Sequence, residues 1–274
     1  MEPGAQRWGG RIERRTSVAA VTAIFFIGGA VILIGAVPRA LRHYEHFPAL
    51  ENIPKLSVNS KGSSADPINV ALIGTDTEIG NALRAAGWVA ADSLSRVSKI
   101  KIAKSVLLNM PDSTAPVSLL FLFGRSQDIA YEKEVGRSAR RRHHVRLWRD
   151  ATISYHGRPV WIGGATYDLK AGISHRGFHP THHIAPDIDE ERDGLEAALA
   201  HVSQAEETFR VTGIGIRLNA RNAEGDRYDT DGELRVVVVP RGNAPQSPPS
   251  DPGVPFAVQI KDRIWAFGHR YGPA

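Results

Sequence analysis

The chain has 274 residues, of which 42% are apolar and 23% are charged, a composition typical of a globular protein and not of an extended disordered one. It contains no cysteine, which excludes disulfides, thiolate nucleophiles and cysteine-ligated metal sites. The net charge is +5, and most of it comes from the first 61 residues, which contain 8 Lys/Arg and 4 Asp/Glu. The rest of the chain is therefore close to neutral and is not expected to have a general nucleic-acid-binding surface.

One apolar run dominates the N-terminal part. It begins at Val18, ends at Val37 and contains no charged residue. At a rise of about 1.5 Å per residue, a helix of this length spans a hydrocarbon core of about 30 Å. A cleavable signal peptide would have a shorter apolar region followed by small residues, whereas Pro38 and Arg39 follow here. The run therefore predicts a single transmembrane helix over residues 18–37, after a basic tail over residues 1–17, with the lipid bilayer as its partner.

Basic residues are more frequent before this run than directly after it. Arg7, Arg11, Arg14 and Arg15 precede it, and only Arg39 and Arg42 follow closely. Because positive charge favours the cytoplasmic side, the chain is expected to be a single-pass protein with its domain on the extracytoplasmic side.

Residues 38–65 contain prolines and small polar residues and are predicted to form a stalk, followed by a globular domain over residues 66–274. A buried strand is expected at 68–73. Thr75 and Glu78 then form a capping-box pattern that opens a helix ending at Ala86, and a second helix is expected over 94–108.

The rest of the domain alternates strand and turn signals. The sequence predicts a helix at 187–203, and strands at 116–123, 128–132, 144–148, 151–155, 160–167, 209–218, 234–239 and 256–267, with hairpins at 124–127 and 156–159. The predicted fold class is α+β, with one mixed, mostly antiparallel sheet and flanking helices.

The first candidate site is a basic segment that enters a strand. If that strand is extended, His144, Arg146 and Trp148 lie on one face. With Arg141 and Arg142, they form a set that can hold a phosphate or carboxylate through charge-assisted hydrogen bonds. The alternative is a solvated basic edge strand that prevents aggregation.

The second candidate is a histidine-rich loop that leads into an acidic helix start. Imidazoles and carboxylates bind zinc or manganese where no thiolate is available, but the spacing matches no standard metal motif. The candidate metal ligands are His143, His144, His182, His183, Asp187 and Asp189. If the two clusters meet across the sheet, a metal-bound water could attack an ester or phosphoester.

Several short motifs resemble the LssY C-terminal domain family. They are 85–88 (AAGW), 114–118 (TAPVS), 122–125 (LFGR) with Gln127 and Asp128, 141–146 (RRHHVR) with Trp148, and 181–184 (THHI) with Asp187 and 189–193 (DEERD). The resemblance implies a bacterial envelope location, so the predicted span is expected to lie in the bacterial inner membrane. It also points to the same two histidine pairs. It supplies no mechanism, because members of that family have no firmly assigned activity. Some members have several membrane-spanning segments, and a function of those members cannot be assigned to a chain with a single predicted span.

Three functions fit these features. The first is an envelope protein whose domain binds an anionic ligand, such as a lipid headgroup, or a protein partner at the membrane surface. The second is a metal-dependent hydrolase of phosphate or ester substrates. The third is a structural subunit of an envelope or secretion assembly, which would expose an apolar patch.

Overall fold

The computed structural model describes residues 9–32, 47–91, 119–136, 138–173, 180–202, 205–242, 253 and 256–271. The predicted helix at 94–108 and the TAPVS motif at 114–118 lie outside these residues. The chain divides into two compact units, Met1–Glu45 and His46–Ala274.

The first unit contains helix α1, Gly9–Val31. Its apolar side chains from Val18 onward are exposed, among them Phe25 and Phe26. Within the described ranges, no helix has the length and apolar character needed to cross a bilayer. Residues 33–37 of the predicted span lie outside the described part.

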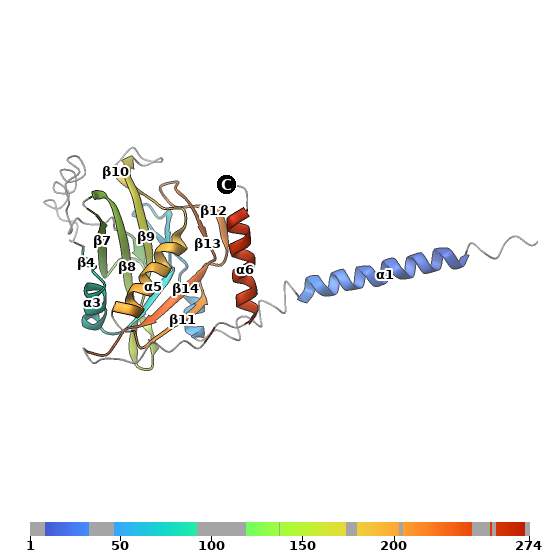
Figure 1. Ribbon diagram of the computed structural model, residues 1–274, viewed down its shortest axis with the longest axis horizontal. Coiled ribbons are helices and arrows are strands. Elements are labelled where there is room, and N and C mark those ends of the chain that lie inside the picture. Colours follow the sequence, from blue (N-terminus) through green and yellow to red (C-terminus); the bar gives the residue numbers. More distant parts are fainter. Residues whose placement is uncertain are drawn as a thin grey trace, which may run out of the picture. The chain divides into compact units, whose positions relative to one another are not determined.

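The second unit is built on one large sheet, with strands in the order β11, β14, β3, β9, β8, β7 and β4 (Figure 1). Strand β10 pairs with β9 beyond the end of β3. Only β14 and β3 run parallel, and the other pairs are antiparallel. The strands are β3 Val70–Ile73, β4 Val89–Ala90, β7 Ile129–Val135, β8 Ser138–Tyr155, β9 Arg158–Ile173, β10 Pro180–Ile184, β11 Glu207–Thr212 and β14 Glu233–Val238. The predicted α+β class and the mostly antiparallel sheet are confirmed.

The long hairpin of β8 and β9 forms the centre of the sheet. His156 and Gly157 both have positive φ, which matches the two-residue turn that right-twisted strands prefer. The predicted strands at 144–148 and 151–155 are one strand, because β8 continues through an irregularity between Asp150 and Ser154.

A small second sheet covers part of one face. It consists of β1 Leu56–Val58, β2 Ser64–Pro67, β5 Phe121–Leu122 and β6 Arg125–Ser126, preceded by the short helix η2, Pro48–Asn52. Leu50 and Ile53 are buried in the core of this side. The folded unit therefore starts before residue 66, inside the segment predicted to be a stalk.

Two helices cover the other face of the large sheet. Helix α3, Asp76–Ala85, has the predicted capping box between Thr75 and Glu78, and α5, Ile188–Val202, matches the predicted helix at 187–203. Leu83 of α3 and Leu195 and Leu199 of α5 pack in one core with side chains of β3, β8 and β9.

The C-terminal prediction is wrong. Residues 256–267 belong to helix α6, Phe256–Tyr271, and not to a strand. Phe256, Ile260, Ile264 and Phe267 recur every three or four residues, which is the period of a helix, and this spacing should have outweighed their β propensity.

The predicted strand at 209–218 is two strands. It divides at the Gly213–Gly215 segment into β11 and β12, Arg217–Arg221. Strand β12 pairs with β13, Arg227–Thr230, which lies between the predicted strands at 209–218 and 234–239.

Candidate functional site

The basic residues of β8 alternate between the two faces of the sheet. Val145 and Leu147 pack in the core beneath α3 and α5, whereas Trp148 packs in the core of the opposite face. By strand alternation, Arg142, His144 and Arg146 share the face of Trp148. On that face, the basic residues therefore lie beyond the apolar core, on the side away from the hairpin turn.

Neighbouring strands add acidic and polar groups to this row. In register, Glu132 of β7 and Thr166 of β9 lie beside His144, and Asp168 lies beside Arg142. All of these side chains are buried. We call the following residues the polar cluster: Asp66, Glu132, Arg142, His144, Arg146, Thr166, Asp168 and His182.

Each arginine of the cluster is paired with a carboxylate. Arg142 Nη1 donates to Glu132 Oε2 at 3.0 Å, and Arg146 Nη1 donates to Asp66 Oδ2 at 3.0 Å. Asp66 comes from β2, which lies against Gly164. A Cβ atom built on Gly164 would be 2.8 Å from the Pro67 carbonyl oxygen, so the missing side chain lets β2 approach β9.

Asp168 lies between two imidazoles. Its Oδ2 is 2.7 Å from His144 Nε2 and 3.8 Å from His182 Nδ1. His182 is the more accessible of the two, with 27% of its side chain exposed. Arrangements of one carboxylate and two imidazoles can hold and transfer protons.

Burial and charge act differently on the carboxylates. Burial would raise the pKa of Asp168, but His144, followed by His182 and Arg146, holds that pKa below its usual value. Burial raises the pKa of Asp66 and raises that of Glu132 to about 7, although Arg146 and Arg142 partly offset this. At neutral pH, Asp168 is therefore ionised, whereas Glu132 is divided between its two forms.

Several buried atoms of the cluster have no hydrogen-bond partner in the part of the chain that the structure describes. They include Glu132 Oε1, Arg142 Nε, His144 Nδ1 and Thr166 Oγ1. Unpartnered buried polar atoms are rare in folded proteins, and a bound ion or water is one common reason for them. The cluster therefore has unused hydrogen-bonding capacity on the neighbouring strands β7, β8 and β9.

Two of the predicted ligand residues lie elsewhere. Arg141 is exposed, and by strand alternation it points to the face opposite Arg142. Trp148 is fully buried, and its Nε1 donates to the Arg125 carbonyl oxygen at 3.3 Å. Of the predicted anion-binding set, Arg142, His144 and Arg146 come together.

The candidate metal ligands are distributed over several places. His143 lies on the helix side of the sheet, 2.6 Å from Glu191 of α5, whereas His144 lies on the other side. His183 is 2.6 Å from Asp226. Among the described residues, no group of three or more His, Asp or Glu side chains is arranged to hold a metal ion.

The two aspartates before and within α5 have structural roles. Asp187 Oδ1 accepts the backbone N–H groups of Asp189 and Glu190, which is the role of a helix N-cap. Asp189 accepts from the hydroxyl of Thr230 and the backbone N–H of Asp231. Burial raises the pKa of Asp189 to about 6.

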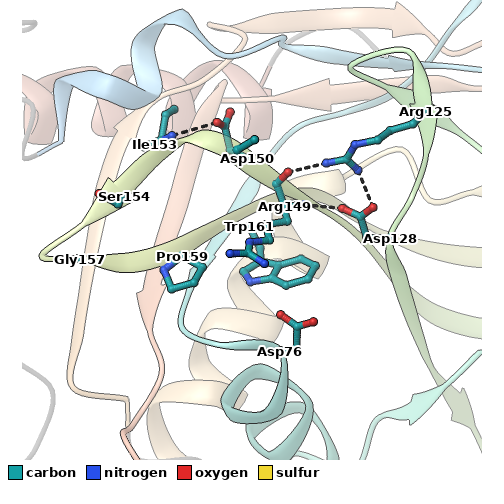
Figure 2. A pocket seen from close by; sticks show the side chains of 11 residues that line it. Asp76, Arg125, Asp128, Arg149, Asp150, Ile153, Ser154, Gly157, Pro159 and Trp161 are labelled. Atoms are coloured by element: carbon teal, nitrogen blue, oxygen red, sulfur yellow. Dashed lines mark hydrogen bonds and ion pairs between the residues drawn. The ribbon is translucent and has the colours of Figure 1, made fainter.

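A separate open pocket lies at the hairpin end of β8 and β9 (Figure 2). Its volume is about 640 Å³, and its lining includes Asp76, Arg149 and Trp161. Figure 2 shows that the Arg125 guanidinium donates hydrogen bonds to Asp128 and to the Arg149 carbonyl oxygen. Both of these acceptors therefore already have a partner within the protein. This pocket contains none of the unpartnered atoms of the polar cluster.

Sequence reasoning missed the acidic half of the site, Asp66, Glu132 and Asp168, together with Thr166. These residues come from three strands that are distant in sequence, so no local motif contains them. One available signal was the segment 161–168 (WIGGATYD), where a single charged residue follows a run of mostly apolar and small residues.

A comparison with protein-family models shows which family the chain belongs to. A family model described as LssY C-terminus matches residues 50–234. The chain belongs to the LssY C-terminus family. The region matched by LssY C-terminus contains the whole polar cluster, from Asp66 to His182, whereas α1 and α6 lie outside it. No curated protein and no solved structure matches the chain significantly.

Proposed function

We propose that this LssY C-terminus domain binds a small anionic group, a phosphate or carboxylate, in the polar cluster. The observation that supports this is the set of unpartnered buried atoms Arg142 Nε, His144 Nδ1 and Thr166 Oγ1. The guanidinium nitrogen and the hydroxyl are donors, and the imidazole nitrogen is a donor in its protonated form. Donors of this kind are the usual partners of oxyanions.

The cluster can accept an anion if one of its carboxylates takes up a proton at the same time. Two guanidinium groups face three carboxylates, of which Asp168 has a lowered pKa while those of Asp66 and Glu132 are raised. An incoming anion increases the proton affinity of nearby carboxylates, so it can be bound with a proton on Glu132. Affinity for the anion should then fall as the pH rises through about 7.

We further propose that the domain acts at the bacterial inner membrane, on the extracytoplasmic side, and is held there by residues 18–37. The uncharged run and its basic N-terminal flank support this location. The exposed apolar side chains of α1 are consistent with a lipid environment. The anion would then be the headgroup of a lipid or an acidic group of an envelope protein.

A pair of buried threonines gives the test. Thr166 and Thr230 are both 1% exposed, but among the described residues only the Thr230 hydroxyl has partners. It donates to Asp189 Oδ1 at 2.6 Å and accepts from the backbone N–H of Gly232. Binding of inorganic phosphate to the full-length protein in detergent would be measured by calorimetry. Thr166→Val should keep the stability of the protein and weaken phosphate binding by about 3- to 10-fold, the value of one hydrogen bond.

Thr230→Val is the matched control. It should lose about 1–3 kcal/mol of stability, because it leaves buried partners unsatisfied, and should keep its phosphate affinity. If the wild type does not bind phosphate or a phospholipid headgroup, or if Thr166→Val binds as tightly as the wild type, the proposal is wrong.

A further inference from the structure

Helix α6 attaches to the domain through its charged side. Lys261 Nζ donates to Glu233, Asp262 accepts from Arg210 Nη1 at 3.0 Å, and His269 lies 3.4 Å from Asp187. Trp265 stacks on His269 on the same side.

The other side of α6 is apolar and exposed. Four large side chains are spaced by three or four residues and therefore form one stripe along the helix. Their exposed fractions are 74% for Phe256, 42% for Ile260, 68% for Ile264 and 67% for Phe267. A helix at the surface of a soluble domain normally turns its apolar side inward and its charged side outward. In α6 this arrangement is reversed, so the stripe requires a partner that accepts apolar groups.

The edge of the stripe indicates which partner fits. At about 100° per residue, Arg263 lies next to Phe256 and Phe267 around the helix axis. It is exposed and forms no ion pair among the described residues. A row of aromatic and aliphatic side chains bordered by an arginine matches the boundary between acyl chains and anionic headgroups.

We propose that α6 lies in the interface of a bilayer that contains anionic lipids, with the stripe among the acyl chains and Arg263 at the headgroups. The proposal rests on the membrane location given above. It adds a second contact, which fixes the orientation of the domain relative to the bilayer. A tethered domain that is held at two points presents one constant face to the lipid surface.

The chain has no native cysteine, so a single introduced cysteine can carry a unique label. Full-length Ile264→Cys with an environment-sensitive fluorophore would be reconstituted into vesicles that contain phosphatidylglycerol and lipid-attached quenchers. Ala266→Cys is the matched control, because it is also exposed but lies about 160° away around the same helix. The expected result is strong quenching at position 264 and little at position 266, with less quenching at 264 in phosphatidylcholine alone.

A third label, at Phe25→Cys in α1, separates the two proposals. Quenching at position 25 without quenching at 264 would keep the tether and overturn the role of α6. No quenching at 25 would overturn the tether, and quenching at 264 in that sample would still support α6. If the 264 label is shielded in detergent without lipid and in proportion to protein concentration, the stripe binds a second copy and the bilayer proposal fails.

Discussion

His144 Nε2 lies 2.7 Å from Asp168 Oδ2, although the two residues occupy diagonal positions on β8 and β9 and not directly opposite ones. The direct neighbours are Thr166 for His144 and Arg142 for Asp168. The Thr166 hydroxyl lies directly opposite His144 and has no hydrogen-bond partner among the described residues. The ion pair and the unpartnered hydroxyl are therefore neighbours on the same face of the sheet.

Replacing Asp168 with asparagine should destabilise the protein. The amide keeps the shape of the side chain but removes the charge that lies near both imidazoles, so the free energy of unfolding should fall by about 1–3 kcal/mol at pH 7. The folded-state pKa of Asp168 is lowered, so its stabilising contribution is present above about pH 4 and is lost as the pH falls further. Urea denaturation of full-length protein from pH 3 to 7 measures both effects.

The control for this substitution is Asp76→Asn. Asp76 is exposed at the start of α3, so its replacement should change stability by about 0.5 kcal/mol or less. Equal losses for the two variants at pH 7 would show that the His144–Asp168 contact does not stabilise the fold.

Glu132→Gln should change the pH dependence of stability in the opposite direction. Burial raises the pKa of Glu132 to about 7, so its contribution is fully present below about pH 4.5 and is lost as the pH rises through 7. Glutamine has no such titration. The variant should gain stability relative to the wild type between pH 5 and 8, by on the order of 2–3 kcal/mol.

Thermal unfolding of wild type and Glu132→Gln across this range checks the prediction, with Glu190→Gln as an exposed control. Parallel curves for wild type and Glu132→Gln would mean that Glu132 ionises normally in the folded protein. The same variant should bind phosphate with a smaller loss of affinity between pH 6 and 8 than the wild type.

Two glycines test the approach of β2 to the large sheet. A methyl group on Gly164 would meet the Pro67 carbonyl oxygen at 2.8 Å, and backbone on both sides leaves little room to move. Gly164→Ala should therefore cost about 1–3 kcal/mol and shift Asp66 away from Arg146. Gly194, within α5, has no atom within 4 Å of the place that a methyl group would occupy, so Gly194→Ala should stabilise the protein by about 0.5–1 kcal/mol. Chemical denaturation of both variants gives the comparison, and a Gly164→Ala protein as stable as wild type would contradict the close contact.

Local patterns were sufficient to predict much of this fold. The capping box at Thr75, the hairpin at His156 and Gly157 and the helix after Asp187 each depend on residues close in sequence, and all three are present. The strand expected at 256–267 was wrong because the apolar residues there recur with the period of a helix. The early start of the domain was missed because Leu50 and Ile53 are buried by strands far away in sequence.

The candidate site could also be predicted only where it depends on residues close in sequence. Alternation along β8 indicated that His144 and Arg146 share a face, because this property belongs to one strand. It could not indicate that Asp66 and Glu132 neutralise the two arginines, since those pairs depend on which strands become neighbours. For the same reason, His182 and His183 were grouped with Asp187 and Asp189 as candidate metal ligands, whereas His182 lies near Asp168 and His183 near Asp226.

The last prediction concerns Arg192 of α5, which is fully buried. Its Nη1 and Nη2 donate to the two carboxylate oxygens of Asp231 at 2.7 and 3.1 Å, and Nη1 also donates to the Glu233 carbonyl oxygen. This bond network joins α5 to the turn before β14. Arg192→Lys keeps the charge but cannot form the two parallel bonds, so it should cost about 2–4 kcal/mol, within the range for breaking buried ion networks.

Arg84→Lys provides the matched comparison, because Arg84 is exposed and its Nη2 donates to Asn81 on the same helix. Its replacement should change stability by about 0.5 kcal/mol or less. Hydrogen exchange then locates the effect: in Arg192→Lys, amides of α5 and β14 should exchange faster while those of α3 keep their protection. If Arg192→Lys unfolds at the same urea concentration as Arg84→Lys, the charge of Arg192 and not its planar shape holds α5 on the sheet.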